Sequence, residues 1–84
     1  MTFAYLVSTF DAEQNETVEG IHATLPGAKA GSLVYTEADR DHSTPPVRKL
    51  TWQRPRHTKN VWVAKGLGYM GHDSVVIERM KVQP

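Results

Sequence analysis

The sequence predicts a small α+β domain, in which one antiparallel sheet of order ββαβββ carries one helix packed on one face. Runs rich in β-branched and aromatic residues, several alternating with a two-residue period, predict strands at 3–10, 17–23, 47–54, 60–65 and 74–82. A helical periodicity occurs once, between the second and third runs. The 84 residues have room for a single domain, residues 1–84, with a thin core.

The first two strands are expected to form a hairpin. Phe3 to Phe10 is apolar and aromatic, and the polar segment Asp11 to Glu16 is typical of a turn. Thr17 to Ala23 then resumes a strand pattern. The two strands are therefore predicted to pair through a loose loop.

The helix is predicted in the 25–40 region, with Thr24 as its N-cap and Pro26 in the first turn, where the missing amide is tolerated. Its apolar stripe is expected to comprise Ala30, Leu33, Val34 and Ala38, while Lys29, Ser32 and Thr36 face elsewhere. Gly27 and Gly31 each weaken such a helix by up to about 1 kcal/mol. A short helix followed by a strand at 33–36 remains an alternative.

Residues 41–46 form a predicted loop, because their proline pair cannot continue a helix. The strands at 47–54 and 60–65 then flank the basic turn RPRHTKN, and a glycine-rich stretch leads to the last strand. Trp62 has apolar neighbours in a predicted interior strand, and we expect its side chain to be buried. Trp52 is expected to be a core residue as well.

The composition argues against several classes of function. There is no cysteine for a disulfide or a thiolate metal site, and the four histidines (His22, His42, His57 and His72) show no metal-ligand spacing. No serine stands in a GxSxG pattern, and the acidic hairpin loop offers no carboxyl with a reason for a raised pKa. We therefore expect a protein that is not an enzyme and has no cofactor. Without a signal peptide or membrane span, a cytoplasmic location is expected.

Two motifs in the glycine-rich stretch are interpreted as coincidental. Residues 66–71 spell GxGxxG, but a strand follows instead of the helix that a dinucleotide site requires. Residues 65–72 loosely match an RNP1 octamer, but the remaining chain is too short for the helix and strand that follow this motif in RNA-recognition modules. We expect a glycine-rich hairpin loop.

The charge is unevenly distributed along the chain. Residues 1–39 carry a net charge of −5 and residues 40–84 a net charge of +6. Such asymmetry is compatible with a basic face for an anionic partner, or with two halves that pair within one fold. The candidate binding residues, from the basic segment and the tyrosine beside it, are Arg48, Lys49, Arg54, Arg56, Lys59, Lys65 and Tyr69. The alternative is an ordinary solvated strand edge.

Four segments in this order carry a resemblance to a class of proteins: YLVS at 5–8, GIHATL at 20–25 leading into AKA at 28–30, WVA at 62–64, and VIERMKV at 76–82. They resemble the small accessory proteins of bacteriophages that infect high-GC actinobacteria. Proteins of this class often bind and alter one host protein. The resemblance is one of architecture and implies no site residue.

The sequence therefore leads to a ranked set of functions. The first is a non-enzymatic accessory protein, phage-encoded and acting in the host cytoplasm, that binds a host protein. The second is a small nucleic-acid-binding module that uses the basic hairpin at 48–65 together with Tyr69. The third is a structural or self-assembling protein, since the oppositely charged regions could pair between copies.

Overall fold

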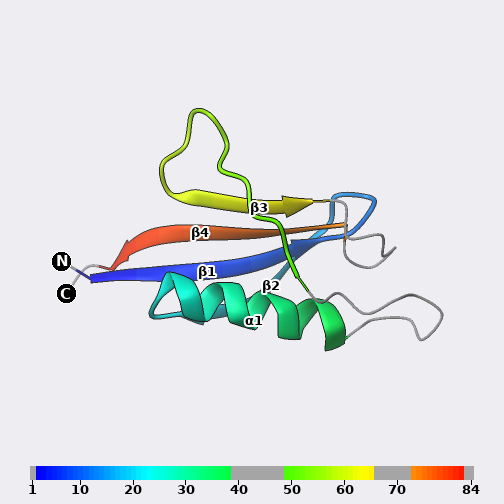
Figure 1. Cartoon of the computed structure of the whole chain (residues 1–84), viewed down its shortest axis with the longest axis horizontal. Coiled ribbons are helices and arrows are strands. Elements are labelled where there is room, and N and C mark those ends of the chain that lie inside the picture. The colour runs from blue at the N-terminus through cyan, green and yellow to red at the C-terminus, as the bar shows by residue number, and fades with distance from the viewer. Residues whose placement is uncertain (1, 39–48, 66–72, 83–84) are drawn as a thin grey trace.

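The computed structural model describes residues 2–38, 49–65 and 73–82, and confirms an α+β fold with one antiparallel sheet and a helix on it (Figure 1). The strands lie in the order β2-β1-β4-β3. The elements are β1 (Thr2–Phe10), β2 (Glu16–His22), α1 (Leu25–Ala38), β3 (Val61–Lys65) and β4 (Ser74–Val82). The predicted hairpin of β1 and β2 and the last two predicted strands are therefore present.

The hairpin loop between β1 and β2 is organised by the Asp11 carboxylate. One of its oxygens accepts hydrogen bonds from the backbone amides of Glu13 and Asn15, each at 2.9 Å, and the other accepts one from the Asn15 side chain at 3.1 Å. The hydrogen bonds from Asn15, followed by that from Glu13, hold the pKa of Asp11 below its ordinary value. Gln14 adopts a φ of 67°, which tightens the turn.

The predicted strand at 47–54 is wrong for the residues that the structure describes, 49–54. They contribute one isolated bridge, in which Gln53 and Val63 exchange two backbone hydrogen bonds of 2.8 Å. The segment leaves the plane of the sheet because Leu50 is buried and Trp52 packs against the core. The composition of this segment predicts strand positions for Leu50 and Trp52, whereas both side chains pack over the helix side of the sheet.

The helix has the predicted N-cap but not the predicted packing face. The Thr24 hydroxyl accepts a hydrogen bond of 3.1 Å from the Gly27 amide. The buried residues are Ala28, Ser32 and Thr36, and the predicted stripe of Ala30, Leu33, Val34 and Ala38 is exposed or only partly buried. Small side chains let α1 lie close to the sheet. The hydroxyl of Ser32 donates to the Ala28 carbonyl at 2.7 Å and that of Thr36 to the Ser32 carbonyl at 3.0 Å, so their burial leaves no polar group unpaired.

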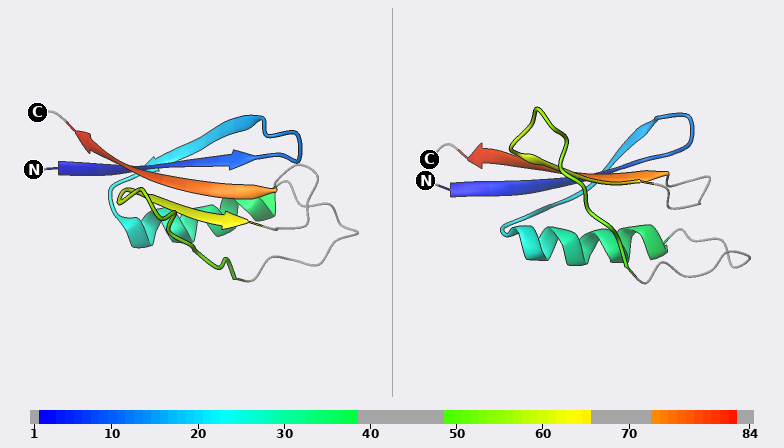
Figure 2. Two further views of the ribbon diagram at one scale, coloured as in Figure 1. Left: turned by 90° about the horizontal axis from the view of Figure 1, so that it is seen from above. Right: turned by 45° about the horizontal axis from the view of Figure 1, so that its top comes forward.

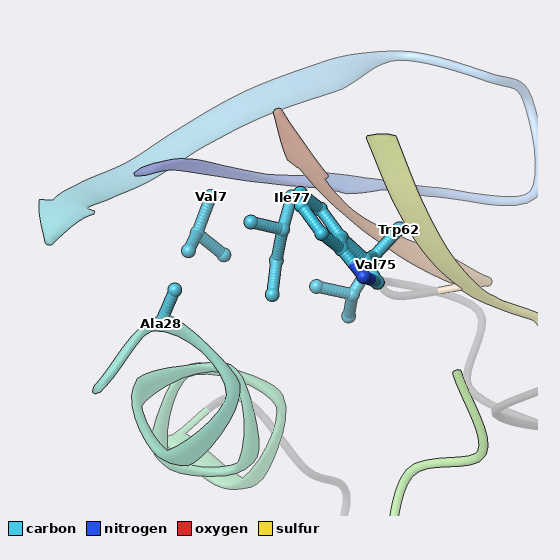
Figure 3. Close-up of a cluster of buried hydrophobic side chains, with 5 residues drawn as sticks. All are labelled: Val7, Ala28, Trp62, Val75 and Ile77. Atoms are coloured by element: carbon cyan, nitrogen blue, oxygen red, sulfur yellow. The ribbon is translucent and has the colours of Figure 1, made fainter. Parts of the chain in front are cut away.

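The core lies between α1 and one face of the sheet. Figure 3 shows the side chains of Val7, Val75, Ile77 and Trp62 on the side of the sheet that faces Ala28 of the helix. Trp62 is 8% exposed, which confirms its predicted burial. Trp52 is partly buried against the same cluster, so the expectation of two core tryptophans holds fully for Trp62 and in part for Trp52.

Candidate docking surface

The sheet has a second face, which no described helix or loop segment covers. Because side chains alternate along a strand, the register that buries Val7, Ile77 and Trp62 under α1 turns their neighbours to the opposite side. The apolar residues of this open face are Ala4, Leu6, Phe10, Val18, Ile21, Val61, Val63, Val76, Met80 and Val82. They come from all four strands. We call this surface the open face.

A β-bulge brings both apolar residues of the edge strand β2 to the open face. Ile21 is paired with Leu6 and Val18 with Ser8, although the two residues are three positions apart and would face opposite sides of the sheet in a regular strand. The register shifts between Val7 and Ser8, where Glu19 is the additional residue. The carboxylate of Glu19 accepts a hydrogen bond of 3.1 Å from Thr9 on the helix side. The bulge thus keeps Val18 and Ile21 on one surface.

Several side chains of the open face are strongly accessible to solvent. Ile21 is 65% exposed, Val18 58% and Val82 43%. Four strands at about 4.8 Å spacing and 3.3 Å per residue give the face an area on the order of 500 Å². Figure 2 shows the layer arrangement, with α1 packed against one side of the twisted sheet. This area is the footprint of the whole face, and most of its other apolar side chains are half-buried. Contiguous exposed apolar residues on soluble proteins are typical of sites where another molecule binds.

The open face carries few charged residues. Some lie on its edge strands and one lies on an inner strand. Glu16 and Lys65 lie at its outer corners, at the ends of the edge strands β2 and β3. Glu78 lies on the inner strand β4, paired with Leu6 on one side and Val61 on the other. It is the charged group on the described part of this face that apolar neighbours surround.

Of the basic candidates from the sequence, Arg54, Arg56 and Lys59 lie together in the turn before β3, whereas Lys49 and Lys65 lie apart from it. Arg48 and Tyr69 lie outside the described residues, and the others that the structure describes are exposed. Arg56 and Lys59 lie in the turn that precedes β3, whereas Lys65 ends this strand, about 13 Å from its first residue. Lys49 lies on the segment that enters the core.

Arg54 has a structural role in the described structure. Its guanidinium lies 4.9 Å from the centroid of the Trp62 ring, and it donates a hydrogen bond to the carbonyl oxygen of Lys59. These contacts hold the turn between 54 and 60 against the sheet. Because the Arg54 guanidinium already makes these two contacts, it is less available to bind a phosphate group of a nucleic acid.

A shallow depression adjoins the open face at the start of β3. It is lined by His57, Thr58, Lys59, Asn60, Val61, Glu78 and Arg79. The Arg79 guanidinium lies 4.6 Å from the centroid of the Phe3 ring and donates a hydrogen bond of 2.6 Å to the Asn60 side chain. Its Nε is buried and has no hydrogen-bond partner in the described structure. Arg79 thus ties the loop before β3 to the sheet.

The histidines that the structure describes form no metal site. His22 contacts the hydroxyl of Tyr35 at 2.8 Å, and His57 is exposed in the turn before β3. In residues 2–38, 49–65 and 73–82, no group of three or more metal-ligating side chains is found. His42 and His72 lie outside these ranges, as does the GxGxxG stretch at 66–71. The strands on either side of that stretch are paired antiparallel.

The sequence reading missed the open face. Its apolar residues were recognised as strand residues, but nothing in the sequence showed that the only described helix covers the other side. The sequence does contain one indication of this face. A strand with one solvated face carries polar residues at every second position, but in Val75–Ile77 and Val61–Ala64 the residues that point to either side of the sheet are all apolar.

Comparisons of the chain with protein-family models, with curated proteins and with solved structures find no match. Among the residues that the structure describes, no helix has the length and apolarity needed to cross a membrane.

Proposed function

We propose that this protein is a non-enzymatic binding module that docks another protein on the open face of its sheet. The observation that carries the proposal is the exposure of Val18 and Ile21 beside an apolar surface contributed by all four strands. Burial of apolar area is the main favourable term in most protein association. The open face supplies such area from all four strands, around Ser8 and the charged Glu78.

The stiffness of the surface supports this role. The residues of the open face belong to hydrogen-bonded strands, and β1 is paired over all its nine residues with β4. A surface that is already ordered loses little conformational entropy when a partner binds. A rigid sheet face is therefore well suited to recognise one partner of matching shape.

Nucleic-acid binding by the basic segment has less support from the geometry. Arg54 stacks on Trp62, and Lys65 lies at the other end of β3 from Arg56 and Lys59. Affinity for nucleic acid comes largely from several phosphate contacts made together. The described basic residues present too few adjacent cations for more than weak binding.

The resemblance to phage accessory proteins guides the choice of partner. Proteins of that class often act by binding one protein of the host, and the open face offers an apolar surface for such a contact. We therefore propose a host protein of an actinobacterium as the partner.

The experiment uses two substitutions matched in exposure. Ile21 on the open face is 65% exposed and Val34 on α1 is 66% exposed. The tagged wild-type protein, Ile21→Gln and Val34→Gln are used to capture proteins from an actinobacterial lysate. The captured protein is then purified, and its dissociation constant for each variant is measured by calorimetry.

We expect Ile21→Gln to weaken binding by at least about 10-fold, because burial of such a side chain contributes about 1.5–3 kcal/mol. Val34→Gln is expected to bind as the wild type does. Thermal melting checks that both variants are folded. Equal affinity of Ile21→Gln and the wild type would contradict docking at the open face.

A further inference from the structure

We infer that the partner of the open face is an amphipathic helix with one lysine or arginine inside its apolar stripe, and that this cation pairs with Glu78. The inference rests on the proposed function and adds the chemistry of the partner. It follows from the position of a single carboxylate on the open face.

Glu78 has apolar neighbours along the sheet and borders the depression that Lys59 and Arg79 also line, although neither cation forms an ion pair with it. In the sheet register it is paired with Leu6 of β1 and Val61 of β3. Along its own strand, the residues that point to the same side are Val76 and Met80. The carboxylate is exposed, and it forms no hydrogen bond or ion pair with another side chain of the described structure. Water is therefore what solvates this charge in the free protein.

A partner that covers the open face removes this water from Glu78. If the partner were wholly apolar, the carboxylate would be buried without a compensating group, which opposes binding strongly. A lysine or arginine of the partner restores the balance, because a charge-assisted hydrogen bond replaces the lost water. Glu78 therefore selects for a partner that has a cation at this point.

A second copy of the chain offers Glu78 one cation on the described part of the open face, and this cation lies at an outer corner of the face. On the described part of the open face the basic residue is Lys65, which lies in register with Ser74 rather than with Glu78. It is about 13 Å along β3 from Val61, the neighbour of Glu78. Two open faces packed with their centres opposite each other would bring two unpaired carboxylates into one apolar layer, whereas a helix with a cation in its stripe would not.

The dimensions of the open face favour a helix as the partner element. Its two central strands, β1 and β4, each have nine residues and extend about 30 Å. A helix of about 20 residues has the same length. The other side of the same sheet already packs α1, which shows that a helix fits along these strands. A lysine in the stripe can lay its aliphatic part on Leu6 and reach Glu78 with its ammonium group.

The test is a selection of displayed helical peptides, with a randomised apolar stripe, on the wild-type protein and on Glu78→Lys. Selection on Ile21→Gln identifies peptides that do not use the open face, and these are discarded. We expect the wild type to select lysine or arginine at one stripe position, and Glu78→Lys to select aspartate or glutamate there. Replacing that lysine by methionine in a selected peptide should weaken its binding to the wild type by at least about 10-fold.

The contrary outcomes separate the inference from the proposed function. Peptides that need Ile21 but show no preference for a charge at any stripe position would overturn the role of Glu78 and leave docking on the open face intact. A selection that yields no peptide dependent on Ile21 would count against both. Sedimentation of the wild-type protein as a dimer that Ile21→Gln converts to a monomer would overturn the inference in favour of a second copy.

Discussion

The imidazole Nε2 of His22, the last residue of β2, lies 2.8 Å from the hydroxyl of Tyr35 on α1. The two rings are tilted by 55° with centroids 5.8 Å apart. Two glycines leave room for the pair. A Cβ atom on Gly31 would lie 2.6 Å from the His22 ring, and one on Gly20 would overlap the Tyr35 hydroxyl. The pair therefore fixes the end of the hairpin to the helix at a point where both backbones approach closely.

This arrangement predicts that Gly20→Ala destabilises the protein by about 1–3 kcal/mol, because the added methyl group must displace the Tyr35 hydroxyl. In a Tyr35→Phe background the same substitution should cost clearly less, since the hydroxyl is absent. Tyr35→Phe alone is expected to cost about 0.5–1.5 kcal/mol for the lost hydrogen bond. Urea denaturation of the four proteins measures the cycle. Equal costs of Gly20→Ala in both backgrounds would be inconsistent with the close approach.

Trp62→Ala is predicted to cost about 3–5 kcal/mol, which is enough to unfold a domain of this size. The indole is 8% exposed, it contacts Tyr5 with ring centroids 6.1 Å apart, and the Arg54 guanidinium lies over it. Trp52→Ala, at the partly buried position, should cost less. Circular dichroism and thermal melting measure both variants. An unchanged melting temperature of Trp62→Ala would contradict the burial.

The elements of this fold could be predicted where local signals and tertiary packing agree. The hairpin of β1 and β2, the Thr24 N-cap and the last strand each follow from residue pattern and turn chemistry. The segment 49–54 resembles a strand in composition, but the packing of Leu50 and Trp52 over the sheet takes precedence over pairing. Strand propensity describes the local backbone preference of a segment. It does not say which part of the hydrophobic core the side chains of that segment will cover.

The packing face of α1 and the open face of the sheet could not be predicted from local sequence preference either. The most apolar stripe of α1 was expected to be buried, yet the contact is made by Ala28, Ser32 and Thr36, whose hydroxyls bond within the helix. Sequence alone does not reveal that small residues permit a close helix–sheet distance. The open face depends on which side of the sheet the helix occupies, and this is a property of the complete packing.

The Asp11 carboxylate in the hairpin loop is expected to make the stability of the folded protein depend on pH. The folded state lowers the pKa of Asp11 through the hydrogen bonds from Asn15 and Glu13. Its contribution to stability is therefore fully present above the pKa of the unfolded chain and is lost as the pH falls through the lower pKa of the folded state. The wild type should exceed Asp11→Asn in stability at neutral pH, and the difference should vanish in acid. A difference that does not change with pH would rule out this role of the carboxylate.

The account also predicts weak nucleic-acid binding. Fluorescence anisotropy with labelled RNA and DNA at low salt should show no sub-micromolar affinity, because the turn before β3 gathers few cations and the Arg54 guanidinium already contacts Trp62. Arg56→Glu with Lys59→Glu is the suitable variant, since it leaves the contact of Arg54 with Trp62 in place. Sub-micromolar binding that this variant abolishes would make nucleic acid the leading partner.

Methyl cross-saturation by NMR tests the docking of a partner on the open face most directly. The protein carries labelled methyl groups on both sides of the sheet, and saturation is transferred from the bound partner protein or selected helical peptide. The account predicts the strongest transfer at Leu6, Val18 and Ile21, with little at the exposed Val34 on α1. Strong transfer at Val34 with none at Ile21 would contradict the account, because it would place the partner on the helix side of the molecule.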